Sequence, residues 1–79
     1  MFYEQNVQNI GMNKFAKRLK ELRITKNLSR AHLAEMLGTS VRTVSYWEEG
    51  KRECGFDMLI TLAKMLDSTV DYLIGATEY

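Results

Sequence analysis

The sequence predicts an all-α protein in which five helices pack into one domain. Its 79 residues contain no proline, the residue that interrupts a helix most strongly. Apolar residues recur three and four positions apart through most of the chain, which is the helical period. Residues that favour helix ends separate these periodic segments at short intervals. A chain of this length buries one modest hydrophobic core and has no room for a second domain.

The first thirteen residues differ from the rest in being polar and rich in side-chain amides. Apolar residues with helical spacing can form a short amphipathic turn there that docks on the body or on a second subunit: Tyr3, Val7 and Ile10. We expect a flexible terminus instead, as is usual at the ends of a domain. The expected organisation is therefore an extension over residues 1–13, a globular domain over residues 14–75 and a tail over residues 76–79.

The first helix of the globular part is expected to start at Asn13, which can cap it, and to reach about Lys26. Its inner stripe consists of apolar residues three or four positions apart: Phe15, Leu19 and Leu22. Arg23 falls on the same inner side in spite of its charge. Asn27 suits the left-handed conformation in which many helices end.

A second, short helix is predicted from Arg30 to Leu37, with Ser29 as its N-terminal cap. Its inner side carries Leu33, Ala34 and Leu37. Gly38 can end this helix because glycine adopts the left-handed conformation readily. Ser40 can cap the helix that follows. The two helices are therefore joined by a turn of three residues.

The third helix follows Ser40 and presents different residues on its two sides. Val44 and Trp47 share one side, with Glu48 beside them. The other side carries small, polar and charged residues: Val41, Arg42, Ser45, Tyr46 and Glu49. A guanidinium, a phenol and a small apolar group next to one another suit the reading of base edges in DNA.

The last two helices contain more apolar surface than one buried stripe requires. The fourth helix is predicted from Phe56 to about Leu66, with an inner stripe of Phe56, Leu59, Ile60, Ala63 and Leu66. The fifth is predicted from Val70 to Ile74, with Thr69 or Ser68 as its cap and Gly75 at its end. The excess apolar residues either close a small core or form a seam between two copies of the chain. We favour the seam, through Met58, Leu62, Met65 and Val70, because a protein that recognises short DNA sites binds more tightly as a dimer.

Charge is distributed unevenly along the chain, although the formal net charge is only +1. Residues 14–52 hold ten Lys and Arg residues against four Glu, a net charge of +6. Residues 53–79 hold one Lys against five acidic residues, a net charge of −4. Such polarisation lets one face meet phosphates while the other avoids them. The alternative interpretation is that the basic residues only solvate ordinary helix surfaces.

Several classes of protein are disfavoured by the composition. Cys54 is the one cysteine, which excludes an internal disulfide and fits a reducing compartment. His32 is the one histidine and has no second metal-binding residue near it, so we expect neither a metal site nor a general base. The sequence has no apolar run long enough to span a membrane and no signal peptide. We therefore expect a cytoplasmic protein that is not an enzyme and has no catalytic residues, no cofactor and no membrane partner.

Most of the chain resembles a known family. The segments RLKELR, LSRAHLAEMLGTSVRTVSYWEEGKR, LITLAKML and VDYLIG, from about Arg18 to Gly75, are similar to the phage Cro and repressor type of helix-turn-helix domain, often called XRE-like. The resemblance implies a five-helix repressor-like fold. Its second and third helices form the helix-turn-helix, and residues 40–46 are presented to the major groove of DNA.

The resemblance also implies roles for individual residues. It gives the base-reading residues as Val41, Arg42 and Tyr46. It gives the phosphate-binding residues as Arg30, Ser40 and Lys51. We also expect Thr43 to contact a phosphate, and Arg52 lies beside Lys51 in a loop from which both can reach one. A structural ion pair between Arg23 and Glu48 is implied as well, and it explains why both charges lie on apolar faces.

Three positions depart from the family pattern. Arg30 stands where many members have glutamine, and it can still reach a phosphate. Glu49 stands where asparagine is common, and its carboxylate repels a phosphate unless Lys51 or Arg52 neutralises it. Cys54 and Gly55 replace a frequent proline. The second departure predicts moderate affinity for DNA.

The function that these features predict is sequence-specific regulation of transcription. We expect a bacterial or phage repressor that acts as a homodimer on a near-palindromic site in double-stranded DNA. Antitoxins and the controller proteins of restriction systems use the same fold and are alternatives. A further alternative is a module that keeps the fold but binds a protein partner and no longer binds DNA, which Glu49 and the low net charge support.

Overall fold

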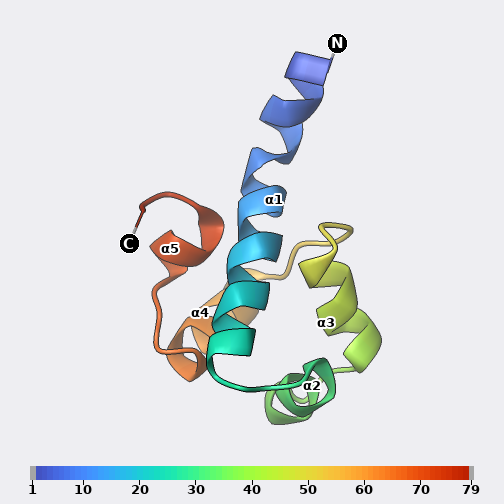
Figure 1. The fold of residues 1–79 in the computed structure, drawn as a ribbon, viewed down its shortest axis with the longest axis vertical. Coiled ribbons are helices and arrows are strands. Elements are labelled where there is room, and N and C mark those ends of the chain that lie inside the picture. The colour runs from blue at the N-terminus through green and yellow to red at the C-terminus, as the bar shows by residue number, and fades with distance from the viewer. Residues whose placement is uncertain (1, 79) are drawn as a thin grey trace.

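The computed structural model describes the backbone of residues 2–78 and the side chains of residues 14–78. All regular structure in this part of the chain is helical, in the order α1 (Phe2–Thr25), α2 (Arg30–Leu37), α3 (Val41–Glu48), α4 (Phe56–Met65) and α5 (Val70–Ile74). Helix α1 runs through the middle of the molecule, with α3 on one side and α5 on the other (Figure 1). The predicted all-α fold of five helices is confirmed.

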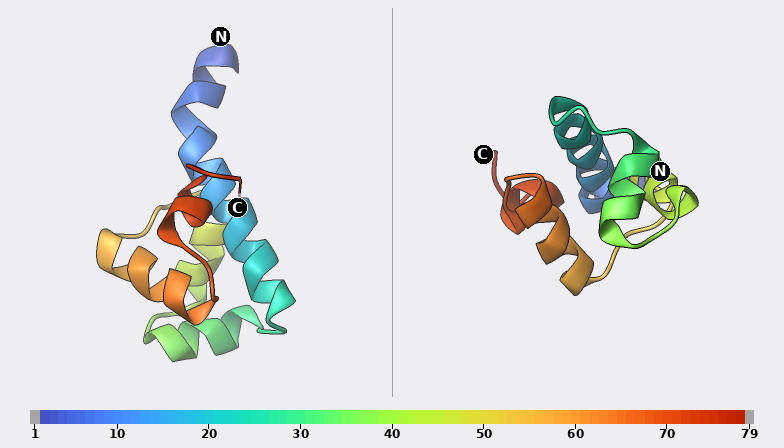
Figure 2. Two further views of the ribbon diagram at one scale, coloured as in Figure 1. Left: turned by 90° about the vertical axis from the view of Figure 1, so that its left-hand side faces the viewer. Right: turned by 90° about the horizontal axis from the view of Figure 1, so that it is seen from below.

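The start of α1 differs from the prediction. The helix begins at Phe2 and continues through Asn13, so the helix boundary expected at Asn13 is wrong. No proline interrupts residues 2–13, and the single Gly11 costs a helix only about 1 kcal/mol. The first turns of α1 extend past the other four helices in two views (Figures 1 and 2). Whether residues 1–13 act as a separate extension stays a prediction.

The hydrophobic core lies where the inner faces of all five helices meet. Its side chains with essentially no exposed surface are Leu19, Leu33, Val44, Leu62, Leu66 and Leu73. Complete burial of such a side chain contributes about 1.5–3 kcal/mol. The largest inner residue of α3, Trp47, is 4% exposed. The side of α3 that bears Val44 and Trp47 is therefore fixed against the body.

Helix α4 buries a different arc from the one predicted. Its buried residues are Leu59, Leu62 and Ala63, followed by Leu66 just after the helix. Phe56 is 85% exposed and Ile60 is 47% exposed, so their assignment to the inner stripe is wrong. The assignment of Leu62 to a dimer seam is also wrong, because its side chain has no exposed surface. The apolar residues of α4 are distributed around most of the helix, and its helical period therefore did not specify which arc would be buried.

Apart from Asn13, the predicted helix caps are present. Ser29, Ser40 and Thr69 each accept a hydrogen bond from the backbone N–H of the third residue of the helix that follows. Gly38 and Gly75 end α2 and α5 with positive φ angles of 73° and 84°. Asn27 also has a positive φ angle, 59°, after α1. These local signals fix the directions in which consecutive helices leave one another.

Candidate nucleic-acid interface

The turn between α2 and α3 sets the position of α3. Gly38 ends α2, and its neighbour Thr39 donates its backbone N–H to the Ala34 carbonyl at 2.9 Å. Ser40 Oγ then accepts a hydrogen bond from the backbone N–H of Thr43 at 3.1 Å and lies 2.9 Å from Thr43 Oγ1. Both hydroxyl groups remain near the surface. Two residues predicted to contact phosphate are thus already joined at the N-terminus of α3.

The two faces of α3 differ sharply in exposure. Val44, Trp47 and Glu48 are buried, whereas Val41 is 45% exposed and Arg42 is exposed. Ser45 and Tyr46 are half-buried. Single exposed aliphatic side chains are common on protein surfaces, so the exposure of Val41 does not by itself identify a partner. The first turn of α3 nonetheless offers an apolar group beside a guanidinium at the molecular surface.

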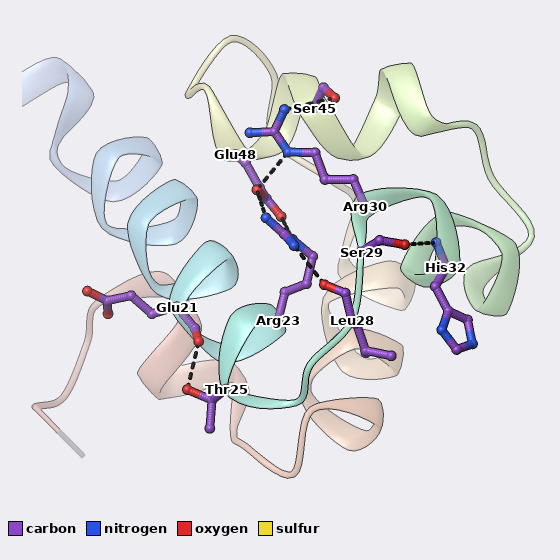
Figure 3. A network of polar contacts seen from close by, with 9 residues as sticks. All are labelled: Glu21, Arg23, Thr25, Leu28, Ser29, Arg30, His32, Ser45 and Glu48. Carbon is purple, nitrogen blue, oxygen red and sulfur yellow. Dashed lines mark hydrogen bonds and ion pairs between the residues drawn. The ribbon is translucent and has the colours of Figure 1, made fainter.

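The ion pair expected between Arg23 and Glu48 is present. Arg23 Nε donates to Glu48 Oε2 at 2.6 Å, and Arg23 Nη2 donates to Glu48 Oε1 at 3.0 Å (Figure 3). Arg23 Nη1 also donates to the Leu28 carbonyl at 2.7 Å. The pair joins α1 to α3, and two parallel hydrogen bonds fix its geometry as well as its charge.

Arg30 makes contacts that the sequence did not predict. Its Nε donates to Glu48 Oε1 at 3.0 Å, and its Nη1 donates to Ser45 Oγ at 3.3 Å (Figure 3). The signal in the sequence was arginine in place of the family's usual glutamine, which introduces a second cation, but the sequence does not show that α2 and α3 bring it to Glu48. The side chain of Arg30 is 33% exposed, so part of the guanidinium still faces solvent.

The end of α3 and the loop after it form two further contacts. The Arg52 guanidinium lies 5.3 Å from the centre of the Tyr46 ring, within the range of a cation–π interaction. Lys51 Nζ lies 3.2 Å from Glu49 Oε1. Lys51 thus balances the carboxylate that the sequence marked as unfavourable for DNA binding. Arg52 covers part of Tyr46, which leaves Val41 and Arg42 as the more accessible base-reading candidates.

Other reactive side chains are unremarkable. Partial burial raises the pKa of the Cys54 thiol to about 11, which keeps it protonated near neutral pH. His32 is exposed on α2. Among the side chains that the structure describes, those of residues 14–78, no group of three or more His, Cys, Asp or Glu could hold a metal ion. Nor does this part of the chain contain a helix with the length and apolar character needed to cross a bilayer.

Residues 19–73, which span the core, the turn and the exposed face of α3, match the model of a helix-turn-helix family. The chain belongs to this family. Three relatives are named as transcriptional regulators of the helix-turn-helix type. The activator BcrR of Enterococcus faecalis is 36% identical over 81% of this chain. The regulator AnsR of Bacillus subtilis is 40% identical over 73% of it. The uncharacterized regulator YobD of Bacillus subtilis is 31% identical over 81% of it.

The chain spans 31% of the length of BcrR, 57% of YobD and 50% of AnsR.

Two solved structures have similar folds. The restriction-modification controller protein C.AhdI from Aeromonas hydrophila is 35% identical with a TM-score of 0.71, and the match covers 78% of this chain and 94% of C.AhdI. Hydroxypropylphosphonic acid epoxidase from S. wedmorenis is 30% identical with a TM-score of 0.78 over 84% of this chain. This match covers 35% of the epoxidase. The likeness to the enzyme therefore concerns one part of it.

Proposed function

We propose that this chain binds double-stranded DNA in a sequence-specific manner through α3 and regulates transcription, most simply as a repressor that blocks a promoter. The observation that carries the proposal is the exposed first turn of α3, where Val41 and Arg42 stand on a helix whose other face is buried. The names of the relatives support regulation of transcription but not its direction, since BcrR is named an activator and AnsR a regulator.

Base recognition falls to the exposed face of α3. Arg42 can donate two hydrogen bonds to O6 and N7 of a guanine, the commonest specific contact in the major groove. Val41 can pack against the methyl group of a thymine. Tyr46 contributes its hydroxyl and ring edge, because Arg52 lies over its ring. Around this face, five residues are proposed to contact phosphates: Arg30, Ser40, Thr43, Lys51 and Arg52. They fix the register of α3 without reading sequence.

The chain is proposed to act as a homodimer on a near-palindromic site. A dimer places two reading helices about 34 Å apart, in successive major grooves. Residues 53–79 carry a net charge of −4, which directs α4 and α5 away from DNA and leaves them for contact with a second copy. Phe56 and Ile60 are the exposed apolar residues of α4. Met58, Met65 and Val70, which are half-buried, would border them.

Selection of bound sequences from a pool of random duplexes tests the proposal. We expect a two-fold symmetric motif that contains a guanine in each half. On the selected duplex, Arg42→Ala should weaken binding by about 1–3 kcal/mol and relax the preference at that guanine. Lys64→Ala, which removes an exposed cation of α4, is the matched control and should bind nearly as the wild type does. A chain that enriches no sequence and binds no duplex at physiological salt would instead be a protein-interaction module.

A second candidate function is control of a restriction-modification system. It is favoured by C.AhdI, because the match covers nearly all of that controller protein at 35% identity. Both functions use the same DNA-binding surface. They differ in the position of the selected motif, which for a controller would lie upstream of restriction and methylation genes. An antitoxin would instead have its motif upstream of a toxin gene.

A further inference from the structure

Glu48 is a buried carboxylate that two arginines from different helices share. Its side chain has no exposed surface. Arg23 reaches it from α1 with two hydrogen bonds, and Arg30 reaches it from α2 with one bond of 3.0 Å (Figure 3). Three helices therefore meet at one carboxylate of α3.

This cluster carries more positive than negative charge. One carboxylate balances two guanidinium groups, so a net charge of +1 remains. Arg23 is 9% exposed, whereas the side chain of Arg30 is 33% exposed, and solvent thus meets the excess charge at Arg30. A bound anion would approach the cluster from that side.

The position of Arg30 is unfavourable unless something holds it. Arg30 is the first residue of α2, where the partial positive charge of the helix end repels a cation. The Arg23 guanidinium bound to the same carboxylate repels it as well. Glu48 and the hydroxyl of Ser45 at 3.3 Å are the contacts that keep the guanidinium against α3.

We propose that Glu48 is a positioning residue for DNA binding. Its carboxylate holds the Arg30 guanidinium between α2 and α3, so that the excess charge of the cluster is presented to one DNA phosphate in a fixed place. This inference rests on the proposed function. It assigns to Glu48 a task beyond the stabilising ion pair with Arg23, and it makes Ser45 a second support for the same guanidinium.

The salt dependence of binding measures the number of phosphates that the protein neutralises. The experiment titrates the wild type, Glu48→Gln, Arg30→Gln and the double variant with the duplex selected by the wild type, over a series of salt concentrations. Arg30→Gln should reduce the slope of log K against log salt by about 0.9, the value for one phosphate contact. Glu48→Gln should reduce it by the same amount, although it removes a negative charge. The double variant should lose no more than either single variant.

Glu49→Gln is the matched control, because it removes a carboxylate of the same charge from the next position. Glu49 contacts Lys51 rather than Arg30, so this variant should keep or increase the slope. Ser45→Ala is a second test that leaves the buried pair intact. It should weaken binding in the wild-type background and have no effect in the Arg30→Gln background. If circular dichroism shows that Glu48→Gln does not fold, this coupling between Ser45 and Arg30 still tests whether binding depends on a fixed position of the Arg30 guanidinium.

Two results would overturn the inference while the proposed function stands. One is a Glu48→Gln protein that folds and keeps the wild-type salt slope. The other is additivity, in which Arg30→Gln costs the same slope with and without Glu48, or Ser45→Ala has the same effect with and without Arg30. A wild-type protein that binds no duplex would instead refute the proposed function itself.

Discussion

Arg18 and Arg23 leave α1 on different sides and attach different helices to it. Arg23 binds the carboxylate of Glu48 on α3. Arg18 Nη1 donates to two backbone carbonyls, those of Tyr72 in α5 and Thr77 after it, each at 2.6 Å. The Arg18 guanidinium also lies 4.2 Å from the centre of the Tyr72 ring. Arg23 also donates to the Leu28 carbonyl, and Arg18 Nη2 lies 3.8 Å from Glu78 Oε1. The main partner of Arg23 is thus a side-chain carboxylate, whereas Arg18 binds mainly backbone carbonyls at and just after the end of α5.

The contact of Arg23 with Glu48 can be predicted from the sequence, whereas the contact of Arg18 with backbone carbonyls cannot. A buried guanidinium needs an acceptor in either case. Glu48 is a charged residue on an apolar face, so the sequence itself marks it as a partner for Arg23. Carbonyls at and just after the end of a helix can accept a further hydrogen bond whatever residues bear them, and the helix dipole attracts cations there. No side chain of α5 therefore indicates in the sequence that Arg18 binds there.

Of the substitutions at these contacts, loss of Arg23, the partner of buried Glu48, should reduce the stability of the fold most. Arg23→Met leaves Glu48 in the core with Arg30 as its one remaining arginine, and should destabilise the fold by about 3 kcal/mol. Urea denaturation of the two proteins measures the change. In the double variant Arg23→Met and Glu48→Leu, the partly exposed Arg30 can turn to water and most of the stability should return. Equal urea midpoints for Arg23→Met and the wild type would refute a structural role for the pair.

The features that could be predicted depend on one or two neighbouring residues. Ser29, Ser40 and Thr69 cap helices because a short side-chain oxygen suits that position wherever it occurs. Gly38 ends α2 for a reason just as local. The two faces of α3 also follow from the helical period, which places Val44 and Trp47 together on one side.

The features that could not be predicted depend on distant parts of the chain. The buried arc of α4 is chosen by the helices around it, because its own apolar residues permit several arcs. Arg30 binds Glu48 only because α2 and α3 bring residues 18 positions apart together. The start of α1 was missed for a different reason, since a polar segment without proline can be helix or coil.

Loss of Arg18, which attaches α5 to α1, should destabilise the protein less than loss of Arg23, and the effect should be concentrated in α5. Arg18→Met removes two charge-assisted hydrogen bonds to α5 and the residues after it, and should cost about 2 kcal/mol. The amides of α5 should exchange with solvent faster, while those of α2 and α3 should be affected less. Hydrogen exchange measured residue by residue tests this distribution. Lys17→Met, on the exposed side of α1, is the control. Unchanged protection of α5 in Arg18→Met would show that packing alone holds this helix.

The smallest expected effect is the difference in stability between alanine substitutions at two glycines that end helices. Gly38 and Gly75 end α2 and α5 with similar positive φ angles, so alanine at either site incurs the same backbone strain of about 1 kcal/mol. A Cβ at Gly38 would meet no atom within 4 Å, whereas one at Gly75 would lie 2.9 Å from Lys14 Cβ on α1. Gly75→Ala should therefore cost about 1 kcal/mol more than Gly38→Ala, because α5 must move away from α1.

Thermal or urea denaturation of both alanine variants gives this difference. Lys14→Ala should recover part of it in the Gly75→Ala background by removing the atoms beyond Cβ, and none in the Gly38→Ala background. Equal costs at the two glycines would mean that α5 shifts freely against α1. The two hydrogen bonds of Arg18 would then be a flexible attachment, unlike the rigid ion pair that binds α3 on the other side.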